Sequence, residues 1–299
     1  MTLEQLRVFV AVAERQHLTH AASALSLTPS AVSSSIKALE ERFGVALFHR
    51  VGRGIEISDA GKTFLDEARR VLASSRAAES VLAELGGLRR GSLTIHASQT
   101  IANYWLPPLL VRFQDLHPSI ELRVDLGNTE QVTRAVVQGS ADIGLIEGAL
   151  QEENLQCRVV AEDRMVVVVR PDHPWASGQK LTAAVLRTGH WVLREAGSGT
   201  RSEFEAALKV IGARRLALRI ALELPSNEAV RSAVLAGPYA AAMSELVAAP
   251  YLRAGLLASA NLDLPVRSFS LLRHPARLRN PAATAFEEIL LQKQDWSGK

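Results

Sequence analysis

The chain has 299 residues, of which 47% are hydrophobic and 22% are charged, a balance that is typical of a folded protein and excludes a disordered one. At about 150 residues per domain, the length predicts two domains. The 34 basic and 31 acidic residues give a net charge of only +3. Residues 1–58 hold six Lys or Arg against five Asp or Glu, so overall charge does not identify a nucleic-acid binder.

The single cysteine, Cys157, excludes a disulfide framework and any zinc site built from several cysteines. It lies in the apolar run 155–161, where we expect a buried side chain. No apolar run reaches about 18 residues, and the first residues form an amphipathic pattern rather than a signal peptide. We therefore expect a cytoplasmic protein without a membrane partner.

The first 44 residues predict three helices. Apolar residues at helical spacing predict one over residues 2–15. Thr19 is a good N-cap for a short second helix that ends at residue 25, and a turn over 26–28 follows. Thr28 and Pro29 then open a third helix, which ends at Gly44. Two helices around such a turn are typical of a helix-turn-helix.

The third predicted helix is amphipathic. Its apolar residues fall within about 40 degrees of Val32 and are Ile36, Leu39 and Phe43. The residues expected to meet a ligand open the helix or lie on its opposite face, and they are Thr28, Pro29, Ser30, Ser33, Ser34 and Lys37. No acidic residue occurs between Arg15 and Glu40, so this hydroxyl-bearing face favours a polyanion, with DNA as the leading candidate. A solvated helix face is the alternative.

Residues 47–57 predict two short strands around a Gly/Arg turn, the pattern of a wing. Arg50 and Arg53 suit phosphate groups or the minor groove, unless they are ordinary turn arginines. Ser58 then caps a helix whose apolar stripe continues for about 28 residues, and we expect a second copy of that helix to cover the stripe. The glycine-rich, basic residues 86–91 predict a linker.

Beyond residue 91 the pattern changes to alternating strands and helices, which predicts a parallel α/β sheet. The strand-like runs are 92–97, 120–126, 143–147, 165–170, 191–194 and 269–273. The helical runs are 105–116, 130–138, 202–211, 228–235 and 282–292.

A motif of fixed type, spacing and order covers the first fifty residues. It comprises Leu3, Leu6, Phe9, Val12, Ala13, Glu14, Leu18, Thr19, Ala21, Ala22, Leu25, Ser30, Ala31, Val32, Ser33, Ile36, Leu39, Glu40, Phe43, Gly44, Leu47, Phe48 and Arg50. With this motif the chain resembles the LysR-type transcriptional regulators. Pro29 stands where the family often has Gln, and Ser34 and Ser35 stand where long polar side chains are common. We therefore expect contacts to the DNA backbone more than forked contacts to bases.

The resemblance implies an N-terminal all-α winged helix-turn-helix over residues 1–58 and a linker and dimerisation helix over 59–90. A C-terminal α/β effector domain over 91–299 would consist of two Rossmann-like subdomains, as in type II periplasmic binding proteins. Subdomain I would span about 91–163 and 267–299, and subdomain II about 164–266.

The resemblance also implies partners. They are double-stranded promoter DNA with dyad symmetry, a small effector whose binding in the cleft changes DNA bending and transcription, and further copies of the chain in a homodimer or homotetramer. Contact with RNA polymerase is compatible with the same resemblance. No cofactor is implied.

Two hydroxyl-bearing segments follow predicted strands and open helices. One holds Ser98, Gln99 and Thr100, and the other holds Ser198, Gly199, Thr200 and Arg201. Because helix starts present free backbone N–H groups, two such loops form a clamp for an anionic effector, unless they are ordinary N-caps. Both resemble the sulfur-assimilation and carbon-fixation subgroup of the family, as does the helix start at Asn227. Glu147, at another strand end, would repel an anion unless it is paired, for example with Arg201.

Catalytic motifs do not occur in the sequence, so we expect no enzyme, no catalytic residue and no metal site. The adjacent Asp172 and His173 are a poor metal pair, and His-Pro pairs are typical of turns. Two alternatives without DNA function remain, a small-anion binding protein and a transferase on the same two-lobed scaffold.

Overall fold

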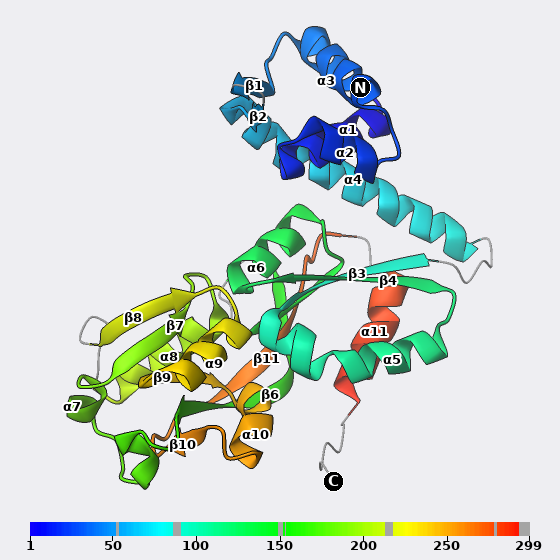
Figure 1. The fold of residues 1–299 in the computed structure, drawn as a ribbon. Coiled ribbons are helices and arrows are strands. Elements are labelled where there is room, and N and C mark those ends of the chain that lie inside the picture. The colour runs from blue at the N-terminus through cyan, green and yellow to red at the C-terminus, as the bar shows by residue number, and fades with distance from the viewer. Residues whose placement is uncertain are drawn as a thin grey trace. The chain divides into compact units, whose positions relative to one another are not determined.

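The computed structural model describes residues 1–51, 54–85, 91–148, 152, 154–212, 218–277 and 280–292. The chain forms two compact units (Figure 1), of which the first contains Met1–Leu88 and the second nearly all of the remainder. None of the helices in these ranges is both long enough and apolar enough to cross a membrane.

The N-terminal unit begins with three short helices, α1 (Leu3–Arg15), α2 (Leu18–Ala24) and α3 (Pro29–Phe43). The start and end predicted for α3 are confirmed, because the Thr28 hydroxyl accepts from the backbone N–H of Ala31 and Gly44 adopts a φ of 65°. The predicted cap of α2 is wrong. His17 precedes the helix and makes no side-chain cap bond, so Thr19 lies one residue inside it.

The core of this unit contains the apolar face of α3 packed on α1. Val32, Ile36 and Leu39 are buried against Phe9, which is fully buried. Phe43 does not join them and is 57% exposed, with the guanidinium of Arg42 5.5 Å from its ring centroid. Helical angle alone placed Phe43 on the buried face, but the helix ends there.

The wing and the long helix follow as predicted. β1 (Phe48–Val51) pairs antiparallel with β2 (Gly54–Ile57), while Arg53 in the turn lies outside the described residues. The Ser58 hydroxyl accepts from the backbone N–H of Gly61, 2.9 Å away, at the start of α4 (Asp59–Leu85). With 27 residues, α4 is about 40 Å long. The predicted linker lies outside the described residues apart from Gly91.

The second unit is an α/β structure. Its strands are β3 (Gly91–Ser98), β4 (Ile120–Gly127), β5 (Ile143–Glu147), β6 (Gln156–Val169), β7 (His190–Arg194), β8 (Arg219–Leu224), β9 (Tyr239–Ser244), β10 (Ala258–Ala260) and β11 (Val266–Arg273). Its α-helices are α5 (Pro107–Leu116), α6 (Thr129–Gln138), α7 (Ala183–Leu186), α8 (Gly199–Val210), α9 (Asn227–Ala236), α10 (Glu245–Arg253) and α11 (Pro281–Leu291). A π-helical turn, Ile101–Trp105, precedes α5, and a 3-10 turn, Pro174–Ser177, follows β6.

The strands form one continuous path in the order β4-β3-β5-β11-β6-β9-β7-β8, with β10 beside β6. The outer neighbours β3/β4, β3/β5, β7/β8 and β7/β9 are parallel. The central pairs β5/β11, β11/β6 and β6/β9 are antiparallel, so the predicted all-parallel sheet is wrong at its centre. Hydrophobic alternation cannot distinguish the two pairings, because both have a side-chain period of two.

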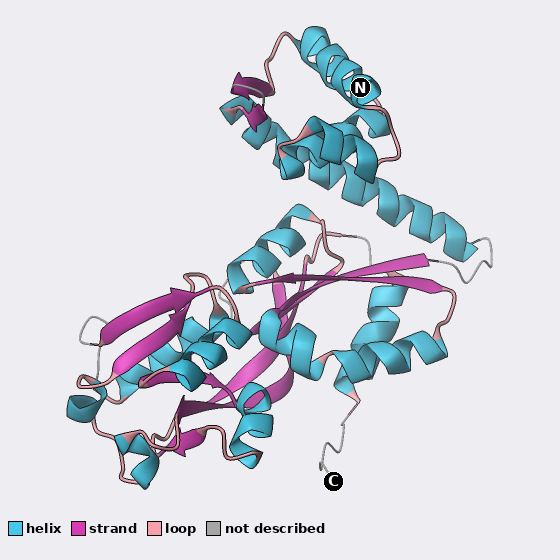
Figure 2. Ribbon diagram, in the orientation of Figure 1, coloured by secondary structure: helices cyan, strands magenta, loops and turns pink. Residues whose placement is uncertain are grey.

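Two halves share this sheet, each with a core of its own. One core contains Phe113, Phe269 and Phe286, and the other contains Trp191 and Phe204. β6 and β11 run through both halves, side by side at the centre of the unit (Figure 1). Helices lie on both sides of the strands (Figure 2).

Cys157 is exposed, so the prediction of a buried thiol is wrong. The first four residues of β6 are all exposed, so side chains on both faces of this part of the strand are accessible, and Val159 nearby is 54% exposed.

Candidate functional site

The outward face of α3 is polar and accessible. Ser30, Ser34 and Lys37 are exposed, Ser33 is half-buried, and Pro29 is exposed in the first turn. Lys37 has one charged partner, Glu41, with 3.4 Å between Nζ and Oε1 and both side chains largely exposed. Such a surface pair contributes about 0–1 kcal/mol, so Lys37 remains available to a phosphate group.

Thr28 is exposed and is also the N-cap of α3. Its hydroxyl caps α3 and lies 3.0 Å from the hydroxyl of Ser30. The cap leaves other backbone N–H groups at the helix start without intrahelical partners, which is the arrangement that binds phosphates.

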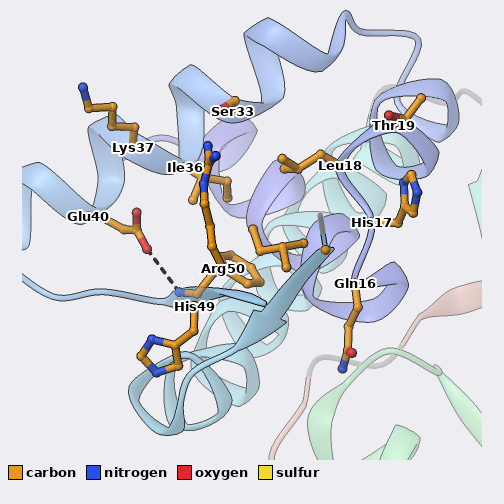
Figure 3. Close-up of a pocket in the computed structure, with 13 residues that line it drawn as sticks. Gln16, His17, Leu18, Thr19, Ser33, Ile36, Lys37, Glu40, His49 and Arg50 are labelled. Atoms are coloured by element: carbon orange, nitrogen blue, oxygen red, sulfur yellow. Dashed lines mark hydrogen bonds between the residues drawn. The ribbon is translucent and has the colours of Figure 1, made fainter. Parts of the chain in front are cut away.

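A hollow of about 580 Å³ separates α3 from the wing and the start of α2 (Figure 3). Ser33, Lys37 and Arg50 line it, which brings three of the predicted DNA contacts together. Glu40, also in the hollow, accepts from the backbone N–H groups of Leu47 and Phe48 at 2.7 and 3.1 Å. This carboxylate is therefore occupied in holding the wing on α3.

Other polar residues of this hollow were missed by the sequence reasoning. Gln16, His17, Thr19 and His49 line it beside the predicted contacts. Gln16 has a φ of 48° and ends α1, and the rings of His17 and His20 stack with centroids 4.0 Å apart. The available signal was Thr19 between His17 and His20 at the start of the second helix.

In the α/β unit, hydrogen bonds join the two halves at the strand ends. The Gln99 side chain donates to the Pro225 carbonyl at 3.0 Å and accepts from the Asn227 backbone N–H at 3.1 Å. The Asn227 amide donates to the Thr100 hydroxyl at 3.2 Å, and both residues are at most 1% exposed. The structure thus brings three predicted effector residues together across 126 to 128 positions of sequence.

Arg194, which ends β7, completes this network. Its guanidinium donates to the Asn227 side-chain oxygen at 2.7 Å and holds Glu195 through two further bonds. Ser98 ends β3 and precedes Gln99 in the sequence, and its hydroxyl is buried without a hydrogen-bond partner among the described residues. A buried unsatisfied hydroxyl costs free energy unless a ligand bonds it.

The second predicted loop opens α8. Ser198 and Thr200 are each 2% exposed, and Ser198 makes no side-chain cap bond. The Thr200 hydroxyl accepts from Arg267 at 3.0 Å, and Arg267 also bonds Asp163 at 2.7 Å. Burial raises the pKa of Asp163, although Arg267 and Ser244 both bond its carboxylate.

Arg201 and Glu147 do not pair, contrary to the expectation. The Arg201 guanidinium bonds Glu205 at 2.9 Å, Glu223 at 2.7 Å and the Arg194 carbonyl at 3.0 Å. Three partners within its own half hold this side chain, whereas Glu147 ends β5 in the other half. The backbone of Gly199, at the start of α8, approaches the Glu147 carboxylate closely, since a Cβ built on Gly199 would be 2.9 Å from Glu147 Oε2.

Tyr104 was also missed. Its hydroxyl donates to Glu228 at 2.9 Å and accepts from Arg231 at 3.2 Å, which adds a link between the halves. Burial raises the pKa of Tyr104. The residue lies in the π-helical turn after Thr100, and such turns recur at functional sites, but no sequence pattern predicts this turn.

Two family models match the chain. Residues 3–62 match the bacterial regulatory helix-turn-helix protein of the lysR family, and residues 86–295 match the LysR substrate binding domain. The chain belongs to the LysR family. The two matches together confirm the resemblance and the two-part fold of this LysR-type regulator.

This LysR-type regulator is also similar to named transcriptional regulators and to solved structures of the family. It is 33% identical over 296 residues to the RuBisCO operon transcriptional regulator of Allochromatium vinosum, covering 98% of this chain and 96% of the relative. Full-length CbnR in complex with its target DNA superposes with a TM-score of 0.70 at 23% identity, covering 97% and 99%. The regulatory domain of CcmR from Synechocystis, solved with 2-PG, superposes with a TM-score of 0.62 at 24% identity, covering 68% and 96%.

Proposed function

We propose that this ligand-responsive regulator binds dyad-symmetric promoter DNA through α3 and the wing. Ser30, Ser33, Ser34 and Lys37 contact the backbone and groove edges, the start of α3 holds a phosphate, and Arg50 contacts DNA from the wing. The accessible hydroxyl face of α3, flanked by the hollow, is the observation that supports this most directly. CbnR, solved on its target DNA, is a structural neighbour that supports the same use of the fold.

The regulator acts as a homodimer or homotetramer in the cytoplasm, without enzymatic activity, and RNA polymerase is a further partner. Leu82, near the end of α4, is 69% exposed, so the far part of its apolar stripe is available to another copy of the helix. A dimer places two recognition helices on two half-sites, which requires dyad symmetry in the DNA.

A small anionic effector binds between the two halves of the α/β unit. Ser98, Gln99, Thr100 and Asn227 form one wall of its site, and Ser198, Gly199 and Thr200 form the other. The unpartnered hydroxyl of buried Ser98 and the uncapped start of α8 supply donors for the anion. Binding exchanges the bonds between the halves for bonds to the effector, and this changes DNA bending and transcription.

A mobility-shift assay with the DNA upstream of the chain's own gene tests the proposal. We expect a specific shift that weakens as salt increases and changes in mobility or affinity when an anionic effector is added. No specific, salt-sensitive shift under any ligand condition would refute the proposal.

A further inference from the structure

Two exposed histidines stand at the start of α2, beside the hollow between α3 and the wing. His17 lines this hollow and makes no cap bond to α2, and His20 follows in the first turn of the helix. Their imidazole rings stack, with centroids 4.0 Å apart and an angle of 15° between the ring planes. Figure 3 shows His17 next to Thr19, on the side of the hollow away from Lys37. A ligand that lies along the hollow from Lys37 therefore reaches the stacked imidazoles.

Most acidic groups on the elements around α2 already have partners. α2 itself contains no acidic residue. On α1 the Glu14 carboxylate bonds Arg69 at 2.9 Å, and on α3 Glu40 accepts from two backbone N–H groups while Glu41 lies 3.4 Å from Lys37. The other titratable or charged residues on these elements are Glu4, Arg7 and Arg15 on α1, Arg42 on α3, and His49, Arg50 and Glu56 on β1 and β2. The hollow thus offers cationic groups with little competing negative charge, which suits a polyanion.

The charge of the stacked pair depends on pH and on what lies beside it. Imidazole is the side-chain group that gains a positive charge between about pH 8 and pH 5, and both of its nitrogens then donate hydrogen bonds. Protons on both His17 and His20 would place like charges on rings whose centroids are 4.0 Å apart, and these charges repel each other. A phosphate group beside the rings offsets that repulsion, so bound DNA favours the protonated pair. By thermodynamic linkage, protons then strengthen DNA binding to the same extent.

We propose that His17 and His20 contact a DNA phosphate across the hollow from Lys37, and that their protonation is coupled to DNA binding. The regulator then binds its promoter more tightly at mildly acidic pH than at mildly alkaline pH. The assignment rests on the proposed DNA binding by α3 and the wing, and it adds two contact residues and a dependence on pH.

DNA binding by the full-length chain at two pH values and constant ionic strength tests this. A labelled fragment of the DNA upstream of the chain's own gene is titrated at about pH 6 and at about pH 8. We expect wild-type affinity to be about fivefold higher at the lower pH, which is the scale of one or two exposed ion pairs. The slope of log affinity against log salt should also be steeper there by about one unit, because a further phosphate is neutralised.

Three variants assign the effect to the pair. Combined His17→Gln and His20→Gln removes most of the dependence on pH and the steeper slope. His20→Arg carries a fixed charge, so it binds at the higher pH about as tightly as the wild type does at the lower pH. His190→Asn, on the exposed start of β7 in the second unit, is the matched control and keeps the wild-type dependence.

Two results would overturn the proposal while leaving the proposed function in place. One is specific wild-type binding that is equally tight at both pH values. The other is a dependence on pH that is as large in the double variant as in the wild type, because the protons then bind elsewhere. If the wild type shows no specific binding at either pH, the proposed DNA function fails as well.

Discussion

Asn227→Ala should destabilise the α/β unit more than its small size suggests. The substitution removes the acceptor for Arg194 at 2.7 Å and the donor to Thr100 at 3.2 Å. Arg194 is 4% exposed and Thr100 is fully buried, so water cannot replace the lost bonds. A hydrogen bond to a charged group contributes about 1.5–3 kcal/mol and a neutral one about 1 kcal/mol. We therefore expect the free energy of unfolding to fall by about 2–4 kcal/mol.

Urea unfolding followed by tryptophan fluorescence measures this directly. All four tryptophans lie beyond residue 91, so the signal reports the α/β unit of the full chain. Asn261→Ala is the matched control, because Asn261 is exposed and donates one bond, to the Gly178 carbonyl at 2.8 Å. A loss for Asn227→Ala no larger than that of the control would show that the network does not form in solution.

Four further predictions concern both units. Lys37→Ala should weaken DNA binding and reduce the slope of log affinity against log salt by about one unit, and an unchanged slope would remove Lys37 from the phosphate contacts. Glu40→Ala should lower the free energy of unfolding of the N-terminal unit by about 1–3 kcal/mol in thermal unfolding, because it leaves two wing N–H groups unbonded. Glu41→Ala, on the exposed surface, should lower it little, and equal effects of the two substitutions would contradict the role of Glu40. Gly61→Ala should lower the melting temperature measured by circular dichroism, although Ala has the better helix propensity, because its Cβ would clash with the backbone carbonyl oxygen of Leu47. A gain in stability would refute that contact. Asp163 has a raised pKa in the folded state, so its contribution to stability falls as the pH rises above the ordinary value of 3.8. Urea unfolding between about pH 4 and 6 should therefore show the wild type losing stability relative to Asp163→Asn. A wild type that gains stability over this range would contradict the direction of the pKa shift.

Local signals predicted the N-terminal unit well. Thr28, Pro29 and Gly44 each act within four residues of their own position, so the sequence determines where α3 begins and ends. Phe43 was misplaced because its exposure depends on where neighbouring helices end, which helical periodicity does not contain. The same limitation explains Cys157, because the exposure of the first residues of β6 depends on which elements cover the two faces of the strand.

The ends of strands in the α/β unit were predictable, but their partners were not. Ser98 and Asn227 stand at strand and helix ends that turn chemistry indicates. The bond from Asn227 to Thr100 joins residues 127 positions apart, and only the three-dimensional structure reveals it. For Arg201 the sequence predicted a contact that the structure does not show. Its position beside a glycine-rich loop suggested a contact with the ligand, whereas its guanidinium is bonded to Glu205 and Glu223.

The two halves of the α/β unit are joined by β6 and β11, which are continuous hydrogen-bonded strands. Any rotation of one half against the other therefore has to change the twist of these two paired strands. The response then depends on the torsional stiffness of these strands, and a glycine or a bulge near the crossing at residues 162–165 would soften it without touching either binding site.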